Sequence, residues 1–117
     1  MLQQPKKDVL ESPLVGIYGT INSKWAILIL FYLSQCTLRF GELHQCIPMA
    51  TEAVLSRELK NLVKHGLVHR EIYREVPPRV EYSLTAIGKE FVPVLDSLQT
   101  FAIKYNKFQA EHPGKKL

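Results

Sequence analysis

Cysteine and long apolar runs are both scarce in this chain. Its 117 residues include only two cysteines, Cys36 and Cys46, too few for a disulfide framework. The longest apolar run, from Trp25 to Leu33, has nine residues, whereas a membrane-spanning helix needs about 20. The polar stretch from Met1 to Pro13 has no apolar segment of the kind that marks a secretory signal. We therefore expect a cytoplasmic protein that does not enter a membrane.

The sequence also lacks the motifs of common catalytic and metal sites. It contains no nucleophile motif and no glycine-rich phosphate loop. His44 and Cys46 are ligands by residue type, but residues two apart do not face each other on a helix, and two further ligands at suitable spacing are missing. We expect no enzyme activity, no catalytic residue, no metal and no cofactor, and we interpret both cysteines as ordinary, partly buried thiols.

The charge balance is basic, with 15 Lys and Arg against 11 Asp and Glu and a net charge of +4. An excess of this size indicates a polyanionic partner only if the cations share one face. The length suits one domain with a single core. We divide the chain into a flexible N-terminal arm at residues 1–11, a domain at residues 12–110 and a disordered tail at residues 111–117.

Apolar periodicity and capping residues predict a mainly α-helical fold with one small β-hairpin. We expect helices at about residues 13–20, 24–35, 40–47, 52–65 and 86–109. Thr51 stands where an N-terminal cap is preferred, Gly66 where a helix ends, and Pro93 predicts a kink or break in the last helix. Strands at residues 67–74 and 80–84 flank a proline-bearing loop. A hairpin directly after two helices joined by a tight turn is the outline of a winged helix-turn-helix.

The helix after Thr51 is predicted to have two unlike faces. At about 100° per residue, one arc facing the core holds Leu55, Leu59, Leu62 and Val63, and the opposite arc holds Ala53, Arg57, Lys60 and Lys64. The major groove of DNA accepts one helix, whose first residues approach the base edges. Arg57 is the best candidate for bidentate contact with guanine, whereas Lys60, Asn61 and Lys64 suit phosphates or further bases. The alternative is a solvated helix face that binds nothing.

The predicted hairpin adds arginines on both sides of its loop, at Arg70, Arg74 and Arg79. A stiff loop flanked by arginines suits contact with the DNA backbone or minor groove. The alternative is local pairing of these arginines with Glu71, Glu75 and Glu81. The complete set predicted to contact double-stranded DNA is Arg39, Thr51, Glu52, Ala53, Ser56, Arg57, Lys60, Asn61, Lys64, Arg74 and Arg79.

These pieces resemble the HxlR family of winged helix-turn-helix regulators over residues 12–105. The matching motifs are Ser23-Lys24-Trp25, Arg39-Phe40-Gly41-Glu42-Leu43, Ile47-Pro48, Gly66-Leu67-Val68, Val76-Pro77-Pro78-Arg79-Val80-Glu81-Tyr82 and Ser83-Leu84-Thr85. The resemblance implies a prokaryotic transcription regulator that binds a near-palindromic operator as a homodimer. It implies pairing through the first and last helices, and the residues that we assign to this interface are Leu14, Ile17, Tyr18, Leu95, Leu98, Phe101, Ala102 and Tyr105.

One departure from the family pattern concerns regulation. Many relatives carry a Cys-Pro pair near the start of the first helix, and some use that cysteine as a sensor; the matching pair here is Ser12-Pro13. We therefore carry no redox role onto Cys36 or Cys46. Two alternatives stay open: a winged-helix module for protein–protein contact, and a switch controlled by oxidants or by an unidentified small-molecule effector.

Overall fold

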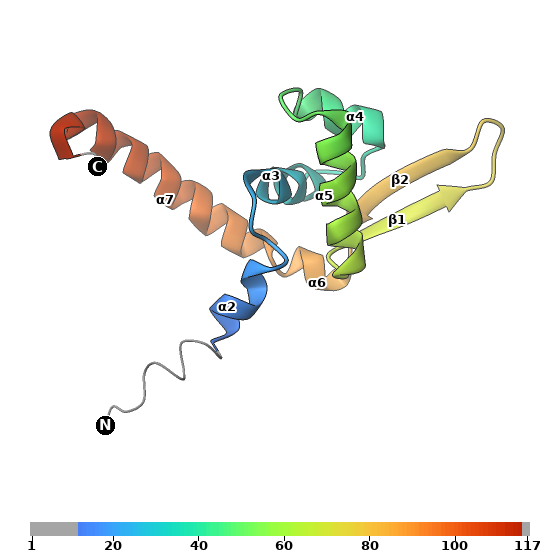
Figure 1. The fold of residues 1–117 in the computed structure, drawn as a ribbon, viewed down its shortest axis with the longest axis horizontal. Helices are drawn as coiled ribbons and strands as arrows, with labels where there is room; N and C mark the ends of the chain where they lie inside the picture. The colour runs from blue at the N-terminus through green and yellow to red at the C-terminus, as the bar shows by residue number, and fades with distance from the viewer. Residues whose placement is uncertain (1–11, 116–117) are drawn as a thin grey trace.

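The computed structural model describes residues 12–115, so the predicted arm at residues 1–11 lies outside the described residues. Its elements in chain order are α2 (Pro13–Tyr18), α3 (Lys24–Leu33), α4 (Phe40–Cys46), α5 (Glu52–Lys64), β1 (Val68–Tyr73), β2 (Arg79–Leu84), α6 (Ala86–Lys89), α7 (Val92–Glu111) and the 3-10 turn η1 (Pro113–Lys115). Helices α3, α4 and α5 form a compact body, β1 and β2 project from one side, and α7 projects from the other (Figure 1). The predicted mainly helical fold with one hairpin is confirmed.

The core lies where α3 is enclosed by α4, α5 and the base of the hairpin. Its fully buried side chains come from every one of these elements: Ile29, Leu30, Leu43, Ile47, Leu55, Leu59, Leu62 and Val68. Burying a leucine or isoleucine of this size stabilises the fold by about 1.5–3 kcal/mol. Three of them come from the inner face of α5, so the core fixes which face of this helix meets solvent.

Local signals set both ends of α5. The hydroxyl of Thr51 accepts a hydrogen bond from the backbone N–H of Val54 at 3.1 Å, which caps the first turn. Gly66 follows the helix with φ of +81°, a conformation that glycine adopts without the penalty of a Cβ atom. This left-handed residue reverses the chain, and β1 begins two residues later.

The strands pair antiparallel in a register that places Val68 opposite Leu84 and Arg70 opposite Tyr82. Leu38 adds one bridge on the other edge, because its N–H and C=O both bond to the backbone of Tyr82, at 3.0 and 2.8 Å. The link between α3 and α4 therefore anchors β2, and the hairpin leaves the body at a fixed angle.

The predicted last helix is broken, but the break precedes Pro93. Helix α6 ends at Lys89 and α7 begins at Val92, so that Pro93 lies in the first turn, where its missing N–H costs nothing. Glu111 ends α7 and Pro113–Lys115 form a turn, while residues 116 and 117 of the predicted tail lie outside the described residues. No helix of the described chain is long and apolar enough to span a membrane.

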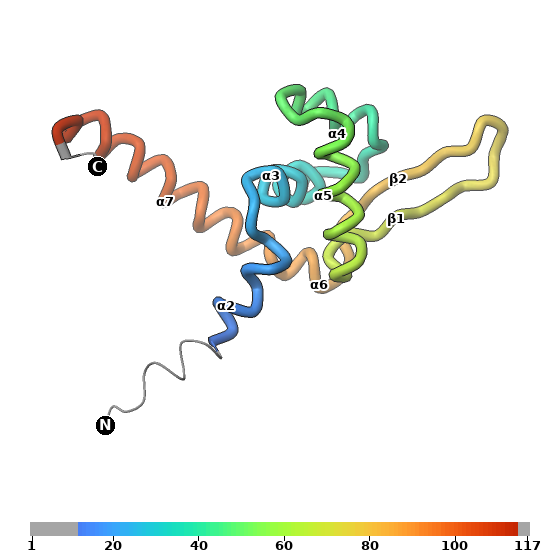
Figure 2. Tube along the Cα trace, in the orientation of Figure 1, coloured from blue at the N-terminus to red at the C-terminus, as the bar shows by residue number. Residues whose placement is uncertain are grey.

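Helix α7 leaves the body and remains largely uncovered, as the tube view also shows (Figure 2). The radius of gyration is 17.7 Å, compared with about 13 Å for a compact domain of this length. Only Leu95 of this helix is buried, and α2 has no buried residue at all. Two apolar helices therefore lie on the outside of a single chain.

Candidate nucleic-acid interface

The outward face of α5 carries cations on a helix that the core holds rigidly. Arg57, Lys60 and Lys64 are exposed, one or two turns apart, and the side chain of Arg57 is 69% exposed. Within residues 12–115 its one ion pair is with Glu58 at 3.9 Å, which is long and adds little at a surface. These cations are therefore available to a ligand.

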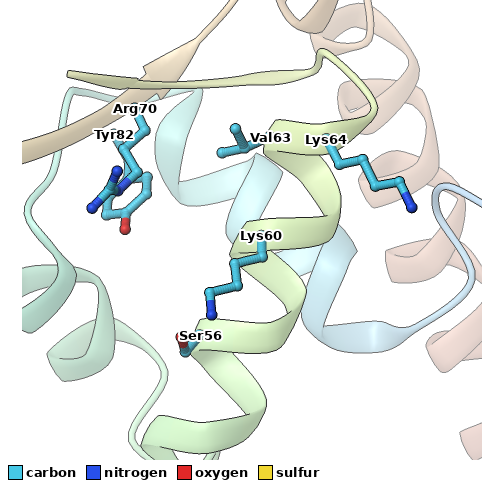
Figure 3. A pocket seen from close by; sticks show the side chains of 6 residues that line it. All are labelled: Ser56, Lys60, Val63, Lys64, Arg70 and Tyr82. Atoms are coloured by element: carbon cyan, nitrogen blue, oxygen red, sulfur yellow. The ribbon is translucent and has the colours of Figure 1, made fainter.

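A groove runs between α5 and the hairpin, with a volume of about 470 Å³. Its lining residues are Ser56, Lys60, Val63, Lys64, Arg70 and Tyr82. In Figure 3, Lys60 points from α5 toward Ser56 on the hairpin side, while Arg70 and Tyr82 lie side by side across the groove. Three cations and two hydroxyl groups thus line one concave space.

The three cations of α5 do not point in one direction. The ammonium groups of Lys60 and Lys64 diverge from each other (Figure 3). Arg57 lines a separate hollow on the other flank of α5, together with Gly19 and Asn22. The side chains of the predicted cationic stripe therefore diverge, and their positive charge extends from the hairpin to the turn between α2 and α3.

The start of α5 is open for close approach. Thr51, Glu52 and Ala53 are exposed, and Ser56 is half-buried. Small side chains at this end leave the first turn accessible to a flat or grooved partner. Exposed Arg39 precedes α4, with its N–H donating to Glu42 at 2.8 Å.

Two residues predicted to contact DNA have hydrogen-bond partners within the chain, of which Asn61 is the first. Its side-chain amide donates to the carbonyl oxygen of Thr20 at 3.3 Å, and the residue is half-buried. Asn61 therefore ties α5 to the link between α2 and α3. The partner is 41 residues away in sequence, so no local pattern could have indicated this bond.

Arg79 is the second, because its guanidinium is bound within the hairpin. It donates to Glu75 at 2.8 Å and to Glu81, and lies over the ring of Tyr73 at 3.9 Å from the centroid. The hydrogen bond from Arg79 to Glu75 lowers the pKa of the Glu75 carboxyl below its ordinary value, and the charge of Arg39 has a smaller effect in the same direction. Local pairing, the alternative considered for the hairpin arginines, is confirmed for Arg79.

The two faces of the hairpin differ in chemistry. Contacts among His69, Glu71, Tyr73, Arg79 and Glu81 lie on one face, where His69 and Glu71 are 2.7 Å apart. Their neighbours in the alternation, Arg70 and Tyr82, line the groove with α5 instead. No ion pair of Arg70 or Arg74 occurs among the described residues, and both are exposed.

Tyr82 and Arg70 line this groove, although neither belongs to the set predicted from the sequence to contact DNA. Strand alternation could have found both: Val68 faces the core, so Arg70 two residues later shares that face. Its cross-strand partner follows once the register is known.

The surface predicted for self-association is exposed, with one exception. Leu14, Ile17, Tyr18, Leu98, Phe101, Ala102 and Tyr105 are accessible. The exception is Leu95, which is 5% exposed and packs in the core of its own chain. Beyond it, the rings of Phe101, Tyr105 and Phe108 stack in succession, with centroids 5.9 and 6.2 Å apart. An apolar hollow of about 350 Å³ lies between α3 and α7, lined by Ile27, Leu28, Phe31, Leu95, Leu98, Gln99 and Ala102.

The thiols occupy different environments: Cys36 is exposed and Cys46 half-buried. The structure thus supports a partly buried thiol only for Cys46. Within residues 12–115, no group of three or more His, Cys, Asp or Glu side chains forms a candidate metal site.

Comparisons with known proteins agree with this geometry. The sequence profile of a family described as HxlR-like helix-turn-helix matches residues 20–110. An uncharacterized HTH-type transcriptional regulator of Methanothermobacter thermautotrophicus is 45% identical over 96 residues, which cover 82% of this chain and 72% of that protein. The HTH-type regulator YdeP of Bacillus subtilis is 38% identical, over 80% of this chain and 73% of the relative. The redox regulator HypR in its reduced form superposes with a TM-score of 0.80 and 30% identity, covering 86% of this chain and 99% of that structure.

Proposed function

The chain belongs to the HxlR-like helix-turn-helix family of transcription regulators, and from this premise we propose that it binds a near-palindromic operator as a homodimer. In this proposal α5 enters the major groove, and the hairpin contacts the backbone or minor groove. The protein acts in the cytoplasm, where it meets DNA, and it regulates without catalysing a reaction.

The observation that carries the proposal is the division of α5 into a buried and a cationic face. Leu55, Leu59 and Leu62 are at most 1% exposed, so the helix cannot rotate without opening the core. Arg57 and Lys60 consequently stay outward, where a duplex supplies both guanine edges and phosphates. A protein-binding module would not require cations spread along this face.

Self-association follows from the uncovered helices. Leu14 and Tyr18 of α2 are 79% and 67% exposed, and Phe101 of α7 is 61% exposed. Covering apolar surface contributes about 25 cal/mol per Å² removed from water. A second copy offers matching apolar surface under two-fold symmetry, in which the same patch serves both partners. The two copies of α5 would then reach major grooves about 34–36 Å apart.

The decisive experiment is selection of bound duplexes from a random DNA pool, followed by titration of the best site against a shuffled sequence. We expect a two-fold symmetric site, tighter binding to it than to the shuffled duplex, and affinity that falls steeply with salt. Equal affinity for both duplexes would reject sequence-specific regulation. Binding without salt dependence would favour the protein-contact alternative.

Control by oxidation is a second candidate, favoured by one specific observation. Cys36 is exposed, and the HypR structures that this fold resembles are of a redox regulator. Ser12 stands at the position that the family resemblance associates with sensing, so this route would need Cys36 itself. The test is operator affinity before and after treatment with diamide, with Cys36→Ser as the control variant. Unchanged affinity in the wild type would exclude thiol control.

A further inference from the structure

We propose that the groove between α5 and the hairpin is a binding site for one phosphate of the DNA backbone, held between Lys60 and Arg70. The inference rests on the proposed function and adds a site to it. Its distinctive claim is that β1 and β2, rather than the loop of the hairpin, supply the main contact of the wing through Arg70 and Tyr82.

The first argument is convergence from separate elements. Lys60 comes from α5, Arg70 from β1 and Tyr82 from β2, yet all three line one hollow of about 470 Å³. The ammonium of Lys60 lies on the Ser56 side of the hollow and the guanidinium of Arg70 on the opposite side (Figure 3). A phosphodiester shares one negative charge between its two non-bridging oxygens, and two cations on opposite sides are suited to one oxygen each.

The second argument is that the site is held in place by the fold. Arg70 and Tyr82 are direct cross-strand partners, and the backbone of Tyr82 is fixed by two bonds to Leu38. On the other side, core leucines fix α5 and therefore Lys60. The backbones that carry the donors are thus fixed before any ligand arrives, so a phosphate can bind without a change in the width of the groove.

The third argument is the difference in ion pairing between the arginines of the hairpin. Arg79 is occupied by Glu75 and Glu81, whereas no ion pair of Arg70 occurs in the described part of the chain. Hydroxyl groups of Ser56 and Tyr82 add neutral donors to the same space. The set consists of cations and hydroxyls without a carboxylate, which is the composition that favours an anion.

The test begins with Arg70→Gln and Tyr82→Phe, measured on the duplex that the wild type binds best after selection. Arg70→Gln should weaken binding about tenfold and reduce the steepness of the salt dependence by about one unit. Tyr82→Phe removes a neutral donor, so it should weaken binding about threefold and leave the salt slope unchanged. Lys89→Gln is the matched control, because it removes one cation from the hollow on the α6 side of the molecule.

The sharper test replaces single phosphates of that duplex with uncharged methylphosphonates, one position at a time. For the wild type, we expect one position per half-site at which binding falls about tenfold. Arg70→Gln should lose clearly less than the wild type at that position, because Lys60 alone then meets the phosphate charge, while keeping the wild-type response at every other position. Equal sensitivity of the variant and the wild type at every position would overturn the phosphate site, with DNA binding intact.

Two further outcomes separate the proposals. A loss in Arg70→Gln confined to one sequence would mean that the arginine reads a base, which overturns the phosphate assignment alone. Failure of the wild type to bind any selected duplex would overturn both this inference and the proposed function. The control is the Tm of each variant. A Tm equal to that of the wild type means that the differences in affinity arise at the interface and not from loss of folding.

Discussion

Gly88→Ala tests whether α6 is packed against the start of the hairpin as closely as the structure shows. A Cβ atom on Gly88 would lie under 3.0 Å from the carbonyl oxygen of Leu67, with the carbonyl carbon at 3.1 Å and the hydroxyl oxygen of Thr85 at 3.3 Å. The nearest obstacle is backbone, so it cannot move aside as a flexible side chain would.

The cost follows from what must shift. The Leu67 carbonyl accepts the N–H of Thr85 at 3.1 Å, and the Thr85 hydroxyl accepts the N–H of Gly88 at 3.0 Å. Overpacking a tight site costs about 1–3 kcal/mol, and weakening one buried hydrogen bond adds about 1 kcal/mol. Alanine returns up to about 1 kcal/mol through its helix propensity. We expect a net loss of about 1–3 kcal/mol in the free energy of unfolding.

The assay is thermal unfolding followed by circular dichroism, at one protein concentration for all variants. A loss of this size should lower Tm by roughly 4–12 °C, at about 4 °C per kcal/mol for a chain of this length. Gly41→Ala is the matched control, since a Cβ on this exposed helical glycine meets nothing within 4 Å, and it should leave Tm unchanged or raise it. A Gly88→Ala protein as stable as the wild type would refute the packing of α6 against Leu67.

Five other substitutions test the site and the fold. Thr51→Ala removes the cap of α5 and should cost about 1 kcal/mol in urea unfolding, with no cost predicted if the cap is absent. Arg57→Ala should weaken operator binding by about 1–3 kcal/mol and relax preference at one base pair, whereas Lys64→Ala should weaken all duplexes alike in the same titrations. Leu98→Glu places a charge on the α7 surface and should yield monomers in sedimentation equilibrium, so an unaltered mass would place the interface elsewhere. Glu75→Gln should lower Tm at neutral pH; because the folded-state pKa of Glu75 lies below 4.5, its stabilisation is present above that value and the difference should vanish as the pH falls through the folded-state pKa.

The elements that sequence predicted correctly are those with local signals. Ser12, Thr51 and Thr85 each accept the cap bond of the helix that follows, and the single left-handed glycine, Gly66, lies where the sequence ends α5. A cap or a turn depends on a few consecutive residues, so it can be read from one sequence. The buried and exposed faces of α5 were predictable for the same reason, except that Val63, which was expected to face the core, is only half-buried.

Sequence alone did not indicate the environment of side chains that contact elements distant in the chain. Asn61 has a suitable position on α5 for DNA, but the link between α2 and α3 passes close enough to take its amide. Leu95 belongs to the predicted apolar stripe of α7, yet the first turns of that helix pack on α3 and bury it. Periodicity gives the direction of a side chain along its own helix and says nothing about which neighbouring element meets it.

The hairpin shows why the count of charges is a poor guide to the interface. Its arginines look equivalent in sequence, but Arg79 is neutralised by Glu75 and Glu81 on one face, while Arg70 opens into the groove on the other. The pairing of anions with Arg79 keeps them from opposing Arg70, so the groove can be strongly positive although the net charge is only +4. Because each neutralised phosphate contributes about 0.9 to the salt slope, the measured slope reports how many cations face the duplex. If the measured salt slope could be reached only by counting Arg79 among the cations that face the duplex, Arg79 would have to leave its two carboxylates. That result would contradict the division of the hairpin into a paired face and a binding face.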